Sequence, residues 1–133
     1  MKNITPVKPQ HKHLIVRAKV QDPLTDPNKT VIWMEELAKL INMKIIMGPF
    51  AKRVEVAGNV GVTAIAGIET SHMALHVWEE EDPPLMQLDV YTCGEMNHNI
   101  VFMHMKQFIP TELECLLLDR EHCIAKIELE VEK

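Results

Sequence analysis

Three apolar, alternating runs between Gly61 and Gly94 restrict the fold more than any other feature of this chain. They cover residues 62–68, 72–78 and 86–92. Runs of this length and pattern are typical of β-strands. A turn at residues 69–71 separates the first two, and an acidic loop at residues 79–84 separates the last two. Because such short connections join antiparallel neighbours, the stretch predicts a three-stranded meander.

Side-chain parity divides this meander into two faces, because successive side chains of a strand point to opposite sides. On the second run Met73, Leu75 and Val77 share one face, while His72 and His76 share the other. On the third run apolar residues alternate with Gln87, Asp89, Tyr91 and Cys93. Two interpretations stay open: the polar residues gather in a site, or they are the water-facing side of a half-exposed sheet.

The rest of the chain supplies two helices and further strands. We expect a strand at 13–20, and a helix capped by Asp26 that starts at Pro27 and runs to about residue 42. Strand pieces at 44–47 and 53–56 follow, interrupted at Gly48-Pro49. A second helix starts after Asn97 and ends before Pro110, and strands at 113–118 and 124–131 close the chain. Residues 1–12 are expected to form a loose arm.

These elements predict an α+β fold, a two-layer sandwich with a mostly antiparallel sheet and two helices packed on one face. The 133 residues suffice for one domain, residues 1–133. The formal net charge of −5, without a Lys/Arg cluster, argues against nucleic-acid binding. No apolar run reaches the ~18 residues of a membrane helix, and the first residues lack a signal core. Three scattered cysteines form no disulfide or zinc pattern, so we expect a reducing cytoplasm.

Several short motifs then point to one family. Ser71-His72 is followed by His76-Val77-Trp78 and by the segment DVYTCG at residues 89–94, and Gly61-Val62-Thr63-Ala64 precedes them. The set resembles the bacterial and archaeal S-adenosylmethionine decarboxylases, with the patterns G-V-S-G, S-E-S-H-x-x-x-H-x-W-P-E and D-x-x-T-C-G. The chain departs from these patterns at several places, among them Thr70 in place of a Glu, Trp78-Glu79-Glu80 in place of W-P-E, and Thr63 in place of a Ser.

The resemblance implies that the chain makes its own cofactor, a pyruvoyl group. Decarboxylation of an amino acid needs an electron sink, and no motif for a pyridoxal or flavin cofactor is visible. By this resemblance, Ser71 of this chain would attack the carbonyl of Thr70. The chain would then be cleaved between the two residues, and Ser71 would become the pyruvoyl group. His76 and Thr63 match the processing residues. Cys93 matches the proton donor to a substrate held as a Schiff base.

The resemblance also implies S-adenosylmethionine as substrate, a role in spermidine and other polyamine synthesis, and a homodimer that shares residues across its sites. Glu80 stands where a carboxylate would bind the ribose, Phe50 would supply an aromatic face for adenine, and Glu69 lies one place before the family's Glu. His72 and His76 share a face, but without a third ligand in the motif we predict no metal site.

Two alternatives remain. The same machinery could decarboxylate another amino acid, such as arginine or ornithine, because the strong motif does not include the substrate pocket. The chain could instead be a relative that binds a ligand without processing itself, since the β-branched Thr70 at the scissile bond would slow the acyl shift.

Overall fold

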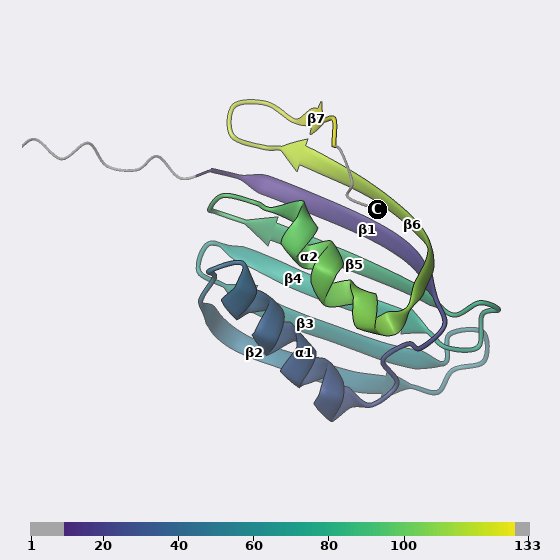
Figure 1. Cartoon of the computed structure of the whole chain (residues 1–133). Coiled ribbons are helices and arrows are strands. Elements are labelled where there is room, and N and C mark those ends of the chain that lie inside the picture. Colours follow the sequence, from purple (N-terminus) through teal and green to yellow (C-terminus); the bar gives the residue numbers. More distant parts are fainter. Residues whose placement is uncertain (1–9, 130–133) are drawn as a thin grey trace, which may run out of the picture.

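One seven-stranded antiparallel sheet carries two helices on one face (Figure 1). The computed structural model describes residues 10–129. The elements in chain order are β1 (Lys12–Val20), α1 (Pro27–Leu40), β2 (Ile45–Val54), β3 (Gly61–Ile68), β4 (Ser71–Trp78), β5 (Leu85–Thr92), α2 (His98–Met105), a 3₁₀ turn (Lys106–Phe108), β6 (Pro110–Asp119) and β7 (Ala125–Ile127). The sheet order is β2-β3-β4-β5-β1-β6-β7. This architecture confirms the predicted two-layer α+β sandwich and the central meander.

The core lies between the helices and the sheet, and strand parity selects its members. Strands β4 and β5 bury alternate residues and turn the others to the helix-free face, as the sequence pattern predicts. The buried side chains of this layer are Leu14, Val16, Met73, Leu75, Val77, Met86, Leu88 and Val90 from the sheet, and Trp33, Met34, Leu37, Val101, Phe102 and Met105 from the helices. Within residues 10–129 both helices cover the same face, so the other face of the sheet has no helix on it.

Side-chain caps start both helices. Asp26 accepts a hydrogen bond from the Asn28 backbone at 2.8 Å, and Asn97 does the same for Asn99 at 3.1 Å. Such caps satisfy amide groups that lack an intrahelical partner. The second helix is shorter than expected, because its last turn tightens into the 3₁₀ segment before Ile109 adopts a left-handed φ of 53°. Neither helix among the described residues is long and apolar enough to cross a membrane.

Two strand predictions were wrong. The pieces expected at 44–47 and 53–56 form one strand, β2, which continues through Gly48-Pro49. Its register shifts once before this pair, between Ile45 and Met47, and once across it, between Met47 and Phe50. Proline is tolerated there because β2 is an edge strand, where a missing amide donor leaves no ladder bond broken. The strand expected at 124–131 is reduced to β7, Ala125–Ile127, and its end lies outside the described residues. The arm expected at residues 1–12 was wrong at its end, because β1 starts at Lys12 and the Gln10 amide donates to the Cys93 carbonyl oxygen at 3.1 Å, while residues 1–9 lie outside the described residues.

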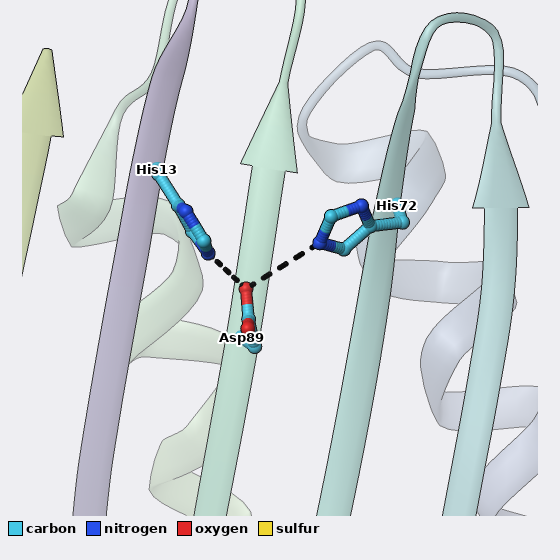
Figure 2. Close-up of side chains that lie close together, drawn as sticks. All are labelled: His13, His72 and Asp89. Carbon is cyan, nitrogen blue, oxygen red and sulfur yellow. Dashed lines mark hydrogen bonds and ion pairs between the residues drawn. The ribbon is translucent and has the colours of Figure 1, made fainter. Parts of the chain in front are cut away.

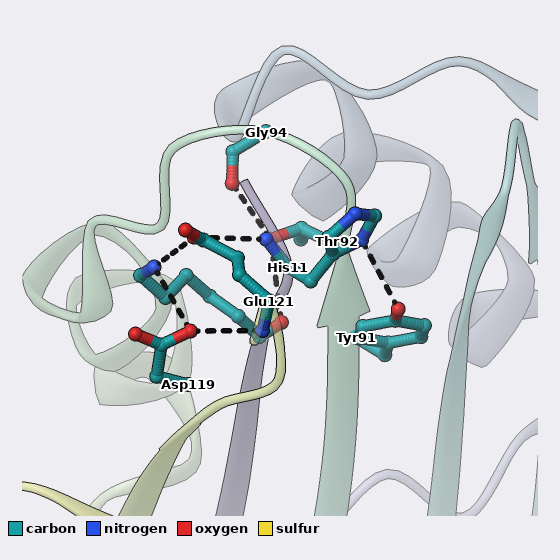
Figure 3. Close-up of polar contacts among 7 residues, drawn as sticks. His11, Tyr91, Thr92, Gly94, Asp119 and Glu121 are labelled. Carbon is teal, nitrogen blue, oxygen red and sulfur yellow. Dashed lines mark hydrogen bonds and ion pairs between the residues drawn. The ribbon is translucent and has the colours of Figure 1, made fainter. Parts of the chain in front are cut away.

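A polar network fixes β1 inside the sheet although it is the first strand of the chain (Figure 3). The Lys12 ammonium contacts Glu121 and lies 3.7 Å from Asp119. Its hydrogen bond lowers the pKa of the Glu121 carboxyl, and that contact in turn raises the pKa of Lys12. A hydrogen bond from the Glu121 backbone lowers the pKa of Asp119. These ionised groups tie the start of β1 to the segment that follows β6.

Candidate active site

The β3–β4 hairpin holds the proposed scissile bond in a strained turn. Ile68 pairs with Ser71, which leaves Glu69 and Thr70 as a two-residue loop. Thr70 has a φ of 59°, in the left-handed region that β-branched residues rarely adopt. A residue held there costs of order 1–3 kcal/mol. The turn therefore stores strain at the residue whose carbonyl Ser71 would attack.

Three side chains converge on the backbone oxygen of Glu69. Thr70 Oγ1 lies 2.7 Å from it, Cys93 Sγ 3.2 Å and Ser71 Oγ 3.4 Å. Cys93 reaches this point because β5 pairs with β4 and His72 lies opposite Tyr91, so the end of β5 lies beside the start of β4. The structure thus brings the predicted nucleophile and the predicted proton donor to one place. We call Glu69, Thr70, Ser71 and Cys93 the turn group.

A second set of predicted residues gathers elsewhere, on the helix-free face of the sheet. Thr63 and His76 are direct cross-strand partners, and Thr63 Oγ1 lies 3.1 Å from His76 Nδ1. With Trp78 they line a hollow of about 300 Å³. Phe50, 65% exposed on the edge strand, lines a neighbouring hollow of about 530 Å³ that also contains Thr63. We call Thr63, His76 and Phe50 the sheet-face group.

Glu80 belongs to the same side of the molecule as the sheet-face group. It lies in the turn after β4 and borders a hollow of about 280 Å³ together with Trp78. Trp78 also lines the hollow of Thr63 and His76, so the two hollows are neighbours. The carboxylate expected to bind ribose is therefore positioned near His76 rather than near Ser71.

The turn group and the sheet-face group do not meet within one chain. Ser71 and His76 both lie on β4, five residues apart. At a rise of about 3.3 Å per residue, that spacing separates them by about 16 Å. An odd spacing also places their side chains on opposite faces of the sheet. Direct proton transfer needs heavy atoms within about 3 Å of each other, so one copy of the chain cannot bring His76 to its own Ser71 in this conformation.

One cluster on the helix-free face was missed by sequence reasoning. Asp89 Oδ1 contacts His13 Nε2 and lies 3.9 Å from His72 Nε2 (Figure 2). Parity had placed His72 and Asp89 on one face. Nothing in the motif pointed to His13, because the insertion of β1 between β5 and β6 is a long-range pairing that the sequence pattern does not reveal.

Several known proteins are similar to this chain in sequence. Residues 12–121 match the family model described as S-adenosylmethionine decarboxylase. A stretch of 85 residues is 36% identical to the S-adenosylmethionine decarboxylase proenzyme of Pyrococcus furiosus, covering 62% of this chain and 57% of that protein. The proenzyme of Archaeoglobus fulgidus is 34% identical over 62 residues, which cover 45% of this chain and 54% of that protein. The matches thus span little more than half the length of these relatives.

A solved structure shares the fold. The crystal structure of the adenosylmethionine decarboxylase from Aquifex aeolicus superimposes with a TM-score of 0.72. It covers 96% of this chain and 100% of that chain, at 19% sequence identity. This likeness supports the sandwich architecture and the strand order on which both groups of residues depend.

Proposed function

Since the chain belongs to the S-adenosylmethionine decarboxylase family, we propose that it is a self-processing, pyruvoyl-dependent decarboxylase of S-adenosylmethionine that serves polyamine synthesis. The observation that carries the proposal is the turn group, where Ser71 follows a left-handed Thr70 and lies beside the Cys93 thiol.

Self-processing begins at the strained turn. Ser71 Oγ attacks the carbonyl carbon of Thr70, and the peptide bond is exchanged for an ester. Loss of the Ser71 Cα proton then breaks the Cβ–Oγ bond, which releases residues 1–70 with a free carboxylate. Water hydrolyses the new N-terminus of the second fragment and releases ammonia, leaving a pyruvoyl group on residues 71–133. Strain at Thr70 supports this reading, because a carbonyl held in an unfavourable turn gains from the rearrangement.

The turn group fits a pyruvoyl cofactor. Such a group supplies the electron sink for the carbanion that forms when carbon dioxide leaves an amino acid. Cys93 lies at the end of β5, and its sulfur is 3.2 Å from the same backbone oxygen that Ser71 Oγ approaches. A thiol at this place can deliver a proton to the substrate Cα, and a positioned acid of this kind contributes about 10²–10⁴-fold to the rate.

We propose further that the site is completed by a second copy of the chain. Ser71 and His76 of one chain are about 16 Å apart along β4, so the sheet-face group that acts on Ser71 has to come from a partner chain. In a two-fold dimer, the Thr63–His76 pair of each chain serves the turn group of the other. Phe50 and Glu80 then contact the adenosine part of the substrate from the partner's side. Exposed apolar residues on the helix-free face, Ile65 among them at 53% exposure, support that face as part of the contact.

The cellular setting of the proposal is a reducing cytoplasm. The described residues include all three cysteines of the chain, Cys93, Cys115 and Cys123, and all three are free thiols. Burial raises the pKa of the Cys115 thiol, which keeps it protonated and unreactive. A free Cys93 is what the proposed proton donor requires.

The test is release of carbon dioxide from carboxyl-labelled S-adenosylmethionine by the purified chain, with labelled arginine and ornithine assayed in parallel. Ser71→Ala is the control, because it removes the only proposed source of the pyruvoyl group. We expect release from S-adenosylmethionine alone, and none from Ser71→Ala. Release from arginine or ornithine instead would assign another substrate. An intact, inactive chain would favour a ligand-binding relative, for which the β-branched Thr70 is the motivating feature.

A further inference from the structure

Two histidines and one aspartate meet on the helix-free face, next to the proposed processing site. His13 on β1 and His72 on β4 both lie opposite Tyr91 of β5, one on each side of it. Asp89 lies two residues before Tyr91 on β5, which makes it the diagonal neighbour of both histidines. Diagonal neighbours on one face are within reach of long side chains. Three adjacent strands therefore direct two imidazoles and a carboxylate toward one point (Figure 2).

The ligand atoms are close enough to hold one metal ion. His13 Nε2 contacts Asp89 Oδ1, His72 Nε2 lies 3.9 Å from that oxygen, and one donor atom of each residue lies within 4.8 Å of the others. Tetrahedral zinc with bonds of about 2.1 Å separates its ligand atoms by about 3.4 Å. The His72 side chain is 50% exposed, and its ring lies against the rings of His13 and Tyr91, with centroids 5.9 and 5.5 Å away. A rotation toward Asp89 keeps it on this half-exposed face of the sheet.

We propose that His13, His72 and Asp89 form a binding site for a divalent cation of the zinc class, with a fourth position open to water. Two neutral imidazoles and one carboxylate are ligands that suit zinc, and they are poor ligands for magnesium or calcium, which prefer oxygen. The ion would join β1, β5 and β4 at the end where β4 begins with Ser71. The proposal rests on the geometry of one chain and does not depend on self-processing.

Arg120 competes with the metal for His13. Its Nη1 lies 3.1 Å from His13 Nδ1, and its guanidinium lies 4.2 Å from the centre of the Tyr91 ring. Because arginine only donates, Nδ1 of His13 carries no proton in this arrangement, and Nε2–H donates to Asp89. Metal binding needs the opposite tautomer, with the lone pair on Nε2 and the proton on Nδ1. The cation therefore has to displace Arg120.

This competition gives the proposal a distinctive test. Arg120→Gln removes a positive charge and provides an amide oxygen that can accept a hydrogen bond from Nδ1–H of His13. Changing a group that hydrogen-bonds to a metal-ligating histidine commonly changes the metal affinity by about 10–100-fold. We expect Arg120→Gln to bind zinc at least several-fold more tightly than the natural chain, a result that a merely structural arginine would not produce.

The experiment uses the full chain without an affinity tag, stripped of metal with a chelator and titrated with zinc against a chromophoric competitor. We expect one zinc per chain. His72→Gln and Asp89→Asn should each lower the zinc affinity by at least about 10-fold, because changes to groups around a metal ligand already cost that much. The control His98→Gln, on α2 in the other layer, should bind zinc like the natural chain. Cobalt in place of zinc should give visible absorption bands that disappear in His72→Gln.

Absence of zinc binding by the natural chain would overturn the proposal, as would unchanged affinity in both His72→Gln and Asp89→Asn. Circular dichroism shows whether Asp89→Asn is folded. His72 is half-exposed, so His72→Gln keeps the test valid if the aspartate variant does not fold. Ser71→Ala should bind zinc like the natural chain, which separates failure of this site from failure of the proposed processing reaction.

Discussion

Mixed dimers test whether the proposed site is shared between two chains. In His76→Ala, Ser71 is intact but the partner's base is missing, so this variant alone should remain uncleaved. Ser71→Ala alone should also remain uncleaved, because it has no nucleophile. When the two are expressed together, a mixed dimer joins an intact Ser71 to an intact His76 at one of its two sites. That site should process the His76→Ala chain.

The extent of rescue follows from the geometry. With equal amounts and random pairing, about half of the His76→Ala chains find a Ser71→Ala partner in a two-fold dimer. About half of all His76→Ala chains should therefore be cut, and none of the Ser71→Ala chains. Ser71 and His76 of one chain lie about 16 Å apart on β4, so cleavage in the mixed sample has to use His76 of the partner chain.

The assay is a denaturing gel of the co-expressed pair, in which fragments 1–70 and 71–133 separate from the intact chain. The control is His76→Ala expressed with a chain that carries both substitutions, and it should give no cleavage. Normal cleavage of His76→Ala alone, or no cleavage in the mixed sample despite dimer formation, would refute the shared site.

Three further predictions follow from the contacts. Cys93→Ala should still be cleaved but lose about 10²–10⁴-fold in decarboxylation rate, measured as carbon dioxide release, and a natural rate would remove the thiol as donor. Gly61→Ala should lower the free energy of unfolding by about 3 kcal/mol in denaturant titration, because its new Cβ would overlap the backbone oxygen of Val77 across the β3–β4 pair; stability equal to the natural chain would contradict that packing. The carboxyl pKa values of Asp119 and Glu121 are lowered from their ordinary values of 3.8 and 4.5, so both ionised groups stabilise the fold at pH values above these ordinary values. This contribution is lost as the pH falls through the lowered pKa values. The melting temperature of Glu121→Gln should therefore fall less on acidification than that of the natural chain, and parallel profiles would contradict this reading.

Alternation of side chains made the meander and its core predictable from the sequence. Met73, Leu75 and Val77 are buried, as their spacing predicts, because the period of a strand is fixed by backbone geometry. Strand geometry also predicts that Ser71 and His76 are separated, because two residues five positions apart on one strand cannot be neighbours in space. Motif spacing alone does not express that distance, so the motif groups two residues that one chain holds apart.

Long-range pairing accounts for what the sequence did not reveal. β1 lies between β5 and β6, and this insertion brings His13 to Asp89 and His72. No local pattern specifies which strands become neighbours when they are far apart in the chain. The continuity of β2 through Pro49 is of the same kind, because it depends on β2 being an edge strand.

The mass of the purified chain after prolonged incubation tests the central claim most directly. We expect two fragments that correspond to residues 1–70 and 71–133. The second should begin with a pyruvoyl group in place of Ser71, and it should therefore be blocked to N-terminal sequencing and gain mass on reduction with borohydride. A single mass equal to that of the intact 133-residue chain, with Ser71 unmodified, would contradict the account.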